Sequence, residues 1–90
     1  MNSLTDLEYR ILDELYFLSS FQTLSDNLNE DDAALKEKLK TLLERNLVAQ
    51  MLYEESLKDY RRLDVPDLAV LEESYFVATK DGLLVHNSRN

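Results

Sequence analysis

Apolar residues recur with helical spacing near the start of the chain. They follow one another three or four positions apart and so share one face of a helix: Leu7, Ile11, Leu15 and Leu18. Thr5, with Glu8 three residues later, matches a capping box, in which the two side chains accept hydrogen bonds from free backbone N–H groups. The pattern predicts a first helix over about residues 6–19.

Two further helices are predicted before Asn46. Two leucines are spaced for a short helix over about residues 24–28, and Thr23 precedes it as a candidate N-cap. A longer helix is predicted over about residues 31–45. Its buried face consists of four leucines: Leu35, Leu39, Leu42 and Leu43. We expect this helix to end at Asn46, because asparagine readily adopts the left-handed conformation that often follows a helix.

The period of the pattern changes after Asn46. Residues 47–54 alternate between two faces, as in a strand with one face toward the core. A second strand is predicted at residues 75–78, which are aromatic, β-branched or small. The two strands therefore lie on either side of a segment of about twenty residues.

Two segments have more than one interpretation. Residues 54–74 are ambiguous, although some local structure is expected because a structureless loop of this length is uncommon in a compact domain. Three positions there are spaced for a short helix that ends before Pro66: Leu57, Tyr60 and either Leu63 or Asp64. Residues 79–87 fit either a hairpin, in which Gly82 takes positive φ, or a last short helix capped by Thr79.

The composition limits the chemistry available to the chain. Its 90 residues fit one domain over residues 1–90, with a frayed tail at 87–90. The absence of cysteine excludes disulfides, thiolate metal sites and cysteine nucleophiles, and a single glycine excludes a glycine-rich phosphate loop. The one histidine, His86, is interpreted as a surface or capping residue. We predict no enzyme activity and no catalytic, cofactor-binding or metal-binding residues.

The charge is negative and unevenly distributed. The net charge is −8, and residues 1–34 carry eight acidic side chains with Arg10 as their only base. The one basic segment is residues 35–45. An acidic surface repels nucleic acid at long range, although acidity more commonly serves solubility. Because the chain has neither an apolar run of about 18 residues nor a signal-peptide pattern, we expect a cytoplasmic protein without membrane contact.

Two stretches of the sequence resemble winged helix-turn-helix proteins. The first, LSDNLNEDDAALKEKLKTLLERNLVAQM (residues 24–51), is similar to the short helix, turn and recognition helix of bacterial MarR-, PadR- and ArsR-type regulators, with Asn46 where these families usually have glycine. The second, FVATKDG (residues 76–82), is similar to the segment that follows their wing. The resemblance covers about residues 4–86. It implies an α+β, mainly α fold: a three-helix core with a small antiparallel β-wing over about residues 47–79.

The resemblance implies a small transcriptional regulator that binds double-stranded DNA through the third helix and the wing. Six basic residues would then contact phosphates: Lys36, Lys40, Arg45, Lys58, Arg61 and Arg62. The start of the third helix lacks side chains suited to contact DNA bases. Ala33 and Ala34 cannot hydrogen-bond to base edges, and acidic residues precede them.

An alternative is a winged helix that binds a protein partner instead of DNA. Its acidic face would meet a basic partner or imitate nucleic acid, and would include Glu30, Asp31 and Asp32. The resemblance also suggests a homodimer, which would use the residues after Pro66 or three aromatic residues: Tyr16, Phe17 and Phe21. We favour core positions for these aromatic residues.

Overall fold

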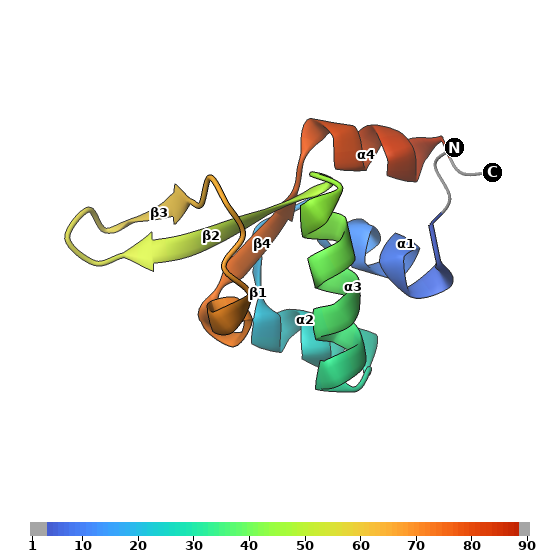
Figure 1. The fold of residues 1–90 in the computed structure, drawn as a ribbon, viewed down its shortest axis with the longest axis horizontal. Helices are drawn as coiled ribbons and strands as arrows, with labels where there is room; N and C mark the ends of the chain where they lie inside the picture. The colour runs from blue at the N-terminus through green and yellow to red at the C-terminus, as the bar shows by residue number, and fades with distance from the viewer. Residues whose placement is uncertain (1–3, 89–90) are drawn as a thin grey trace.

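The computed structural model describes residues 4–88, and this range contains both helices and short strands (Figure 1). The elements follow in this order: α1 (Asp6–Glu14), β1 (Ser19–Ser20), α2 (Phe21–Leu28), α3 (Asp32–Glu44), β2 (Val48–Glu54), β3 (Asp59–Arg62), the 3₁₀ helix η1 (Leu68–Glu73), β4 (Tyr75–Ala78) and α4 (Lys80–Asn87). The strands form one antiparallel sheet. The predicted α+β class is confirmed.

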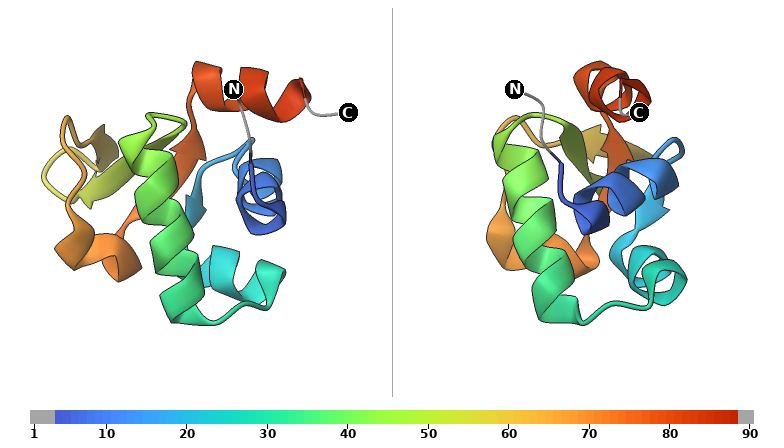
Figure 2. Two further views of the ribbon diagram at one scale, coloured as in Figure 1. Left: turned by 45° about the vertical axis from the view of Figure 1, so that its right-hand side comes forward. Right: turned by 90° about the vertical axis from the view of Figure 1, so that its right-hand side faces the viewer.

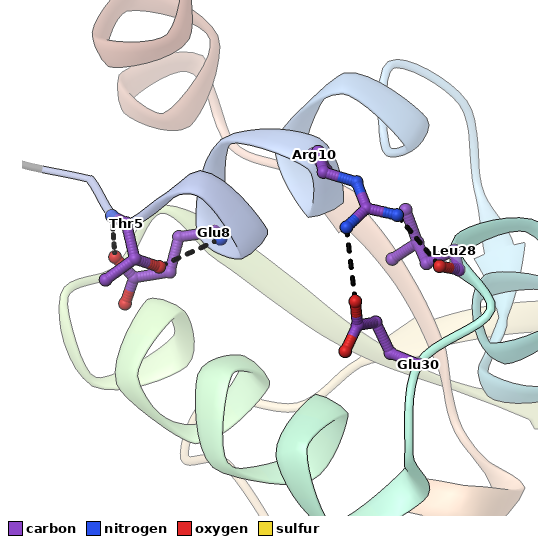
Figure 3. A network of polar contacts seen from close by, with 5 residues as sticks. All are labelled: Thr5, Glu8, Arg10, Leu28 and Glu30. Atoms are coloured by element: carbon purple, nitrogen blue, oxygen red, sulfur yellow. Dashed lines mark hydrogen bonds and ion pairs between the residues drawn. The ribbon is translucent and has the colours of Figure 1, made fainter.

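Helix α1 begins as predicted and ends earlier. The Thr5 N–H donates to Glu8 Oε1 at 2.8 Å, and the Glu8 N–H donates to Thr5 Oγ1 at 3.1 Å, which is the predicted capping box (Figure 3). The last residue of α1 is Glu14, about five residues before the predicted end. The next segment joins the sheet instead: the Leu15 carbonyl accepts a hydrogen bond from the Ala78 N–H at 2.9 Å. After a turn, Ser19 and Ser20 pair with β4, so these backbone groups are satisfied in the sheet rather than in a longer helix.

Helix α2 is longer than predicted, whereas α3 lies where it was predicted. Helix α2 begins at Phe21 because Ser20 is its N-cap, with the Thr23 N–H donating to Ser20 Oγ at 3.1 Å. The assignment of Thr23 as the cap is therefore wrong. Helix α3 ends within about one residue of each predicted boundary. Asn46 follows it with φ of 59°, which confirms the left-handed conformation.

The sheet places β2 between β3 and β4. The strand order is β1-β4-β2-β3, and Met51 lies opposite Arg62 of β3 and Tyr75 of β4. Strands β2 and β4 occupy the two segments that were predicted as strands. Strand β1, which the pattern did not predict, pairs with β4 at the edge of the sheet.

Residues 57–63 do not form the predicted helix. Lys58 has φ of 50° in the turn between β2 and β3, and Tyr60 lies directly opposite Tyr53. The two tyrosine rings are 5.3 Å apart in a T-shaped pair, and Tyr60 makes a similar pair with Tyr75 at 4.9 Å. Such cross-strand aromatic pairs stabilise a hairpin, so pairing with β2 overrides the helical spacing. The hairpin of β2 and β3 projects away from the helices (Figure 1).

Residues 79–87 form a helix rather than a hairpin. Thr79 caps α4, and its Oγ1 accepts a hydrogen bond from the Gly82 N–H at 3.0 Å. Gly82 does not have positive φ, so it does not serve as a turn residue. A Cβ atom at this position would lie 2.0 Å from the Leu47 carbonyl oxygen. Glycine is therefore required for the close approach of two backbone segments.

The core lies between the first three helices and the sheet, while α4 lies across one end of the molecule (Figure 2). Within residues 4–88, eight apolar side chains have no exposed surface: Ile11, Leu12, Leu15, Leu24, Leu35, Leu39, Leu42 and Phe76. Phe21 is buried, as we favoured. The same interpretation is wrong for Phe17, which is 81% exposed, and for Tyr16, which is 41% exposed, because α1 ends before both residues.

His86 is buried, so the interpretation as a surface or capping residue is wrong. Its ring stacks on Tyr9 with 4.4 Å between the ring centres. Its Nδ1 atom lies 3.0 Å from the Tyr16 hydroxyl oxygen, and its Nε2 atom lies 3.3 Å from Asp13 Oδ1. Three partners from the α1 region thus surround one side chain of α4. His86 is part of the contact that holds α4 on α1.

Candidate interaction surface on α3 and η1

The side chains of α3 divide into an inner and an outer face. Leu35 and Leu39 are completely buried, which turns Ala33, Glu37 and Lys40 outward. A groove of about 450 Å³ lies beside this outer face. Its lining comes from α3 and from η1: Ala33, Lys36, Glu37, Lys40, Leu68 and Leu71. The helix that the family resemblance assigns to DNA thus forms one wall of a groove.

A buried glutamine holds η1 in this position. Gln50, on β2, is 2% exposed. Its Nε2 donates to the Asp67 carbonyl at 2.9 Å and to Ser74 Oγ at 2.8 Å, and its Oε1 accepts from the Asp67 N–H at 2.9 Å. Asp67 and Ser74 are the residues that flank η1, and Ser74 Oγ also donates to the Val70 carbonyl at 2.6 Å. Both ends of η1 are therefore fixed to the sheet.

Lys36 crosses from α3 to η1 and pairs with Glu72. The hydrogen bond to Glu72 raises the pKa of Lys36 above its ordinary value of 10.5. Partial desolvation opposes this shift in pKa, while the negative charges of Glu72, Asp32 and Glu73 add to it. Three carboxylates are therefore close enough to influence one ammonium group.

The other residues predicted to contact phosphate fall into two groups. On α3, Lys40 Nζ lies 3.9 Å from Glu44 Oε2, and Arg45 is the C-cap residue. On the hairpin, Arg61 Nε donates to Glu54 Oε1 at 2.7 Å, and Arg62 Nη2 donates to Asn46 Oδ1 at 3.3 Å. Lys58 lies at the turn of the hairpin. The bond to Asn46 brings Arg62 to the end of α3, whereas Lys58 is at the far end of β3.

The three acidic residues of the alternative prediction have different surroundings. Glu30 Oε2 lies 3.2 Å from Arg10 Nη1, and Arg10 Nη2 donates to the Leu28 carbonyl at 2.8 Å (Figure 3). This pair fastens the loop between α2 and α3 to α1. Asp31 is exposed at the N-cap of α3 and makes no capping hydrogen bond with its side chain. Asp32 accepts a hydrogen bond from Ser25 Oγ at 2.9 Å.

The sequence analysis did not identify the η1 side of this surface. Leu68, Glu72 and Glu73 belong to the segment that was left ambiguous. Asp67 before an apolar run is a local signal for a helix start, and it does cap η1 by accepting from the Ala69 N–H at 3.1 Å. No local signal places η1 beside α3, because the residues that hold it, Gln50 and the buried Leu71, act through contacts with segments distant in sequence.

Two kinds of feature are absent from residues 4–88: a metal-ligand cluster and a membrane-spanning helix. No three histidine, aspartate or glutamate side chains of this range converge as the ligands of a metal ion would. None of its helices has the length and apolar composition needed to cross a bilayer. Comparison with known proteins found no matching family model, curated protein or solved structure.

Proposed function

We propose that the chain is a winged-helix module that binds a basic protein partner through α3 and η1. The order of elements supports the winged-helix assignment. A short strand between α1 and α2 pairs with β4, and α2 and α3 are followed by the antiparallel pair of β2 and β4. Strand β3 and η1 lie between β2 and β4 in sequence, at the position of the wing.

The charge around Lys36 is the observation that carries the proposal. The two lysines that line the groove and the acidic residues around them comprise two ammonium groups and five carboxylates: Lys36, Lys40, Asp32, Glu37, Glu44, Glu72 and Glu73. Phosphate groups approaching this face meet a surplus of negative charge, which opposes DNA binding. The same surplus attracts a cationic partner and accelerates its association.

Duplex DNA is the second candidate. It is favoured by the position of Arg62 at the end of α3 and by Lys58 on the projecting hairpin. Fluorescence anisotropy of mixed-sequence duplex DNA, from low to moderate salt, distinguishes the two. We expect no binding at moderate salt. Binding with a log–log salt slope of about 0.9 per phosphate contact, lost in the Lys36→Glu, Lys40→Glu double variant, would refute the proposal.

A lysine-rich peptide tests the proposal directly. We expect the protein to bind it in a salt-dependent manner and the Asp32→Asn, Glu73→Gln double variant to bind it more weakly. The control is the double variant Glu55→Gln, Asp64→Asn, which makes the same change in charge at exposed positions outside this surface. If both variants weaken binding equally, the peptide responds only to net charge, and α3 and η1 are not the binding surface.

A further inference from the structure

We infer that the groove between α3 and η1 takes an amphipathic helix of the partner, with an apolar stripe flanked by lysine or arginine. This inference rests on the proposed function and adds to it the form of the partner segment. Three features support this inference: the apolar floor of the groove, the secondary structure of its walls and the charged residues along its edges.

The groove has an apolar floor that is open to solvent. Leu71 is 4% exposed and Leu68 is 43% exposed, and Ala33 is exposed on the opposite wall. A volume of about 450 Å³ lies in the range of cavities that hold ligands. The small side chain of Ala33 lets another backbone approach α3 closely. Apolar side chains of a partner would remove Leu68 from water.

The walls of the groove favour a helix over a strand. Neither wall is a strand, because α3 is a regular α-helix and η1 is a 3₁₀ segment with a kink at Val70. The groove therefore offers no free strand edge for an extended peptide. The α3 residues of the lining run from Ala33 to Lys40, which is about two helical turns, or about 10 Å. A second helix presents apolar side chains over such a length at positions i, i+3, i+4 and i+7.

The charged residues along the edges of the groove, its rim, favour a cationic helix. Lys36 is held by Glu72 across the groove, and Lys40 lies near Glu44. The lysines of the lining are thus already matched by carboxylates, and the groove also contains Glu37. Lysine or arginine residues beside the apolar stripe of the partner would complement this rim.

Two peptides of leucine and lysine, each of about 18 residues or five helical turns, test the inference. They share one composition, but only the first has an ordered apolar stripe. We expect fluorescence anisotropy to show about tenfold tighter binding of the ordered peptide. Ala33→Trp, which fills the groove, and Leu68→Ser, which removes its floor, should abolish this preference. Leu84→Ser is the control, because Leu84 is 58% exposed on α4 and lies outside the groove.

Each outcome separates the inference from the proposed function. Equal binding of both peptides, or an unchanged preference in Leu68→Ser, would overturn the inference and leave a basic partner in place. Failure of both peptides to bind would overturn the proposed function as well. An equal loss in Leu84→Ser and Leu68→Ser would also refute the groove as the site. Circular dichroism of each variant confirms that the fold is retained before binding is compared.

Discussion

The substitution Gly82→Ala sets helix propensity against a close contact in the structure. Gly82 is the third residue of α4. The added Cβ would lie 2.0 Å from the Leu47 carbonyl oxygen and 3.3 Å from Leu12 Cδ2. The Leu47 carbonyl cannot simply turn away, because it accepts a hydrogen bond from the Thr79 N–H at 3.0 Å. Helix α4 must therefore move away from Leu47.

The expected change in the free energy of unfolding follows from one stabilising and two destabilising effects. Replacing glycine with alanine inside a helix stabilises it by about 1 kcal/mol. Overpacking costs about 1–3 kcal/mol, and weakening the Thr79 hydrogen bond costs about 1 kcal/mol more. We expect a net loss of about 1–3 kcal/mol in the free energy of unfolding. In a chain of this size the melting temperature falls by several degrees, on the order of 10 °C.

Urea unfolding followed by circular dichroism measures this difference. Lys80→Ala is the matched control, because Lys80 is exposed in the first turn of the same helix, and a change of less than about 0.5 kcal/mol is expected there. A Gly82→Ala variant as stable as the original chain, or more stable, would show that propensity dominates. The contact between α4 and Leu47 would then be looser than the structure describes.

Three further predictions concern caps, buried polar groups and charge. Thr5→Ala should lower the free energy of unfolding by about 1 kcal/mol, because one half of the capping box is lost; no change in urea unfolding would contradict this role. Gln50→Ala should cost about 2–3 kcal/mol, because the Asp67 backbone groups lose their buried partner, and proteolysis just before β4 should become faster. If cleavage there is unchanged, other contacts hold η1. Glu72→Gln should lower the pKa of Lys36 toward 10.5, as an NMR titration of its Nζ would show. Because the pKa of Lys36 is raised in the folded chain, its ion pair with Glu72 stabilises the fold at neutral pH, and this contribution is lost as the pH rises through that pKa. A Lys36 pKa that does not move in the variant argues against the pair.

Features that depend on neighbours within a few residues were predictable. The capping box of Thr5 and Glu8, the leucine face of α3 and the left-handed Asn46 all match the structure. Their physical basis is local, since each depends on side chains near free backbone groups or on the period of one helix. The acidity of the α3 start, on which the alternative function rested, was likewise evident from the order of residues.

The sequence by itself therefore determined which segments form helices and strands over most of the chain, whereas the tertiary structure decided their limits and neighbours. Helix α1 ends at Glu14 because the segment after it joins the sheet, and Tyr60 lies in a strand because Tyr53 is opposite it. Gly82 is needed for its contact with Leu47, not for a turn. The groove is formed where Gln50 and the buried Leu71 hold η1 beside α3. Each of these contacts joins residues that are distant in sequence, and hydrogen bonding and burial between distant segments leave no signal in local periodicity.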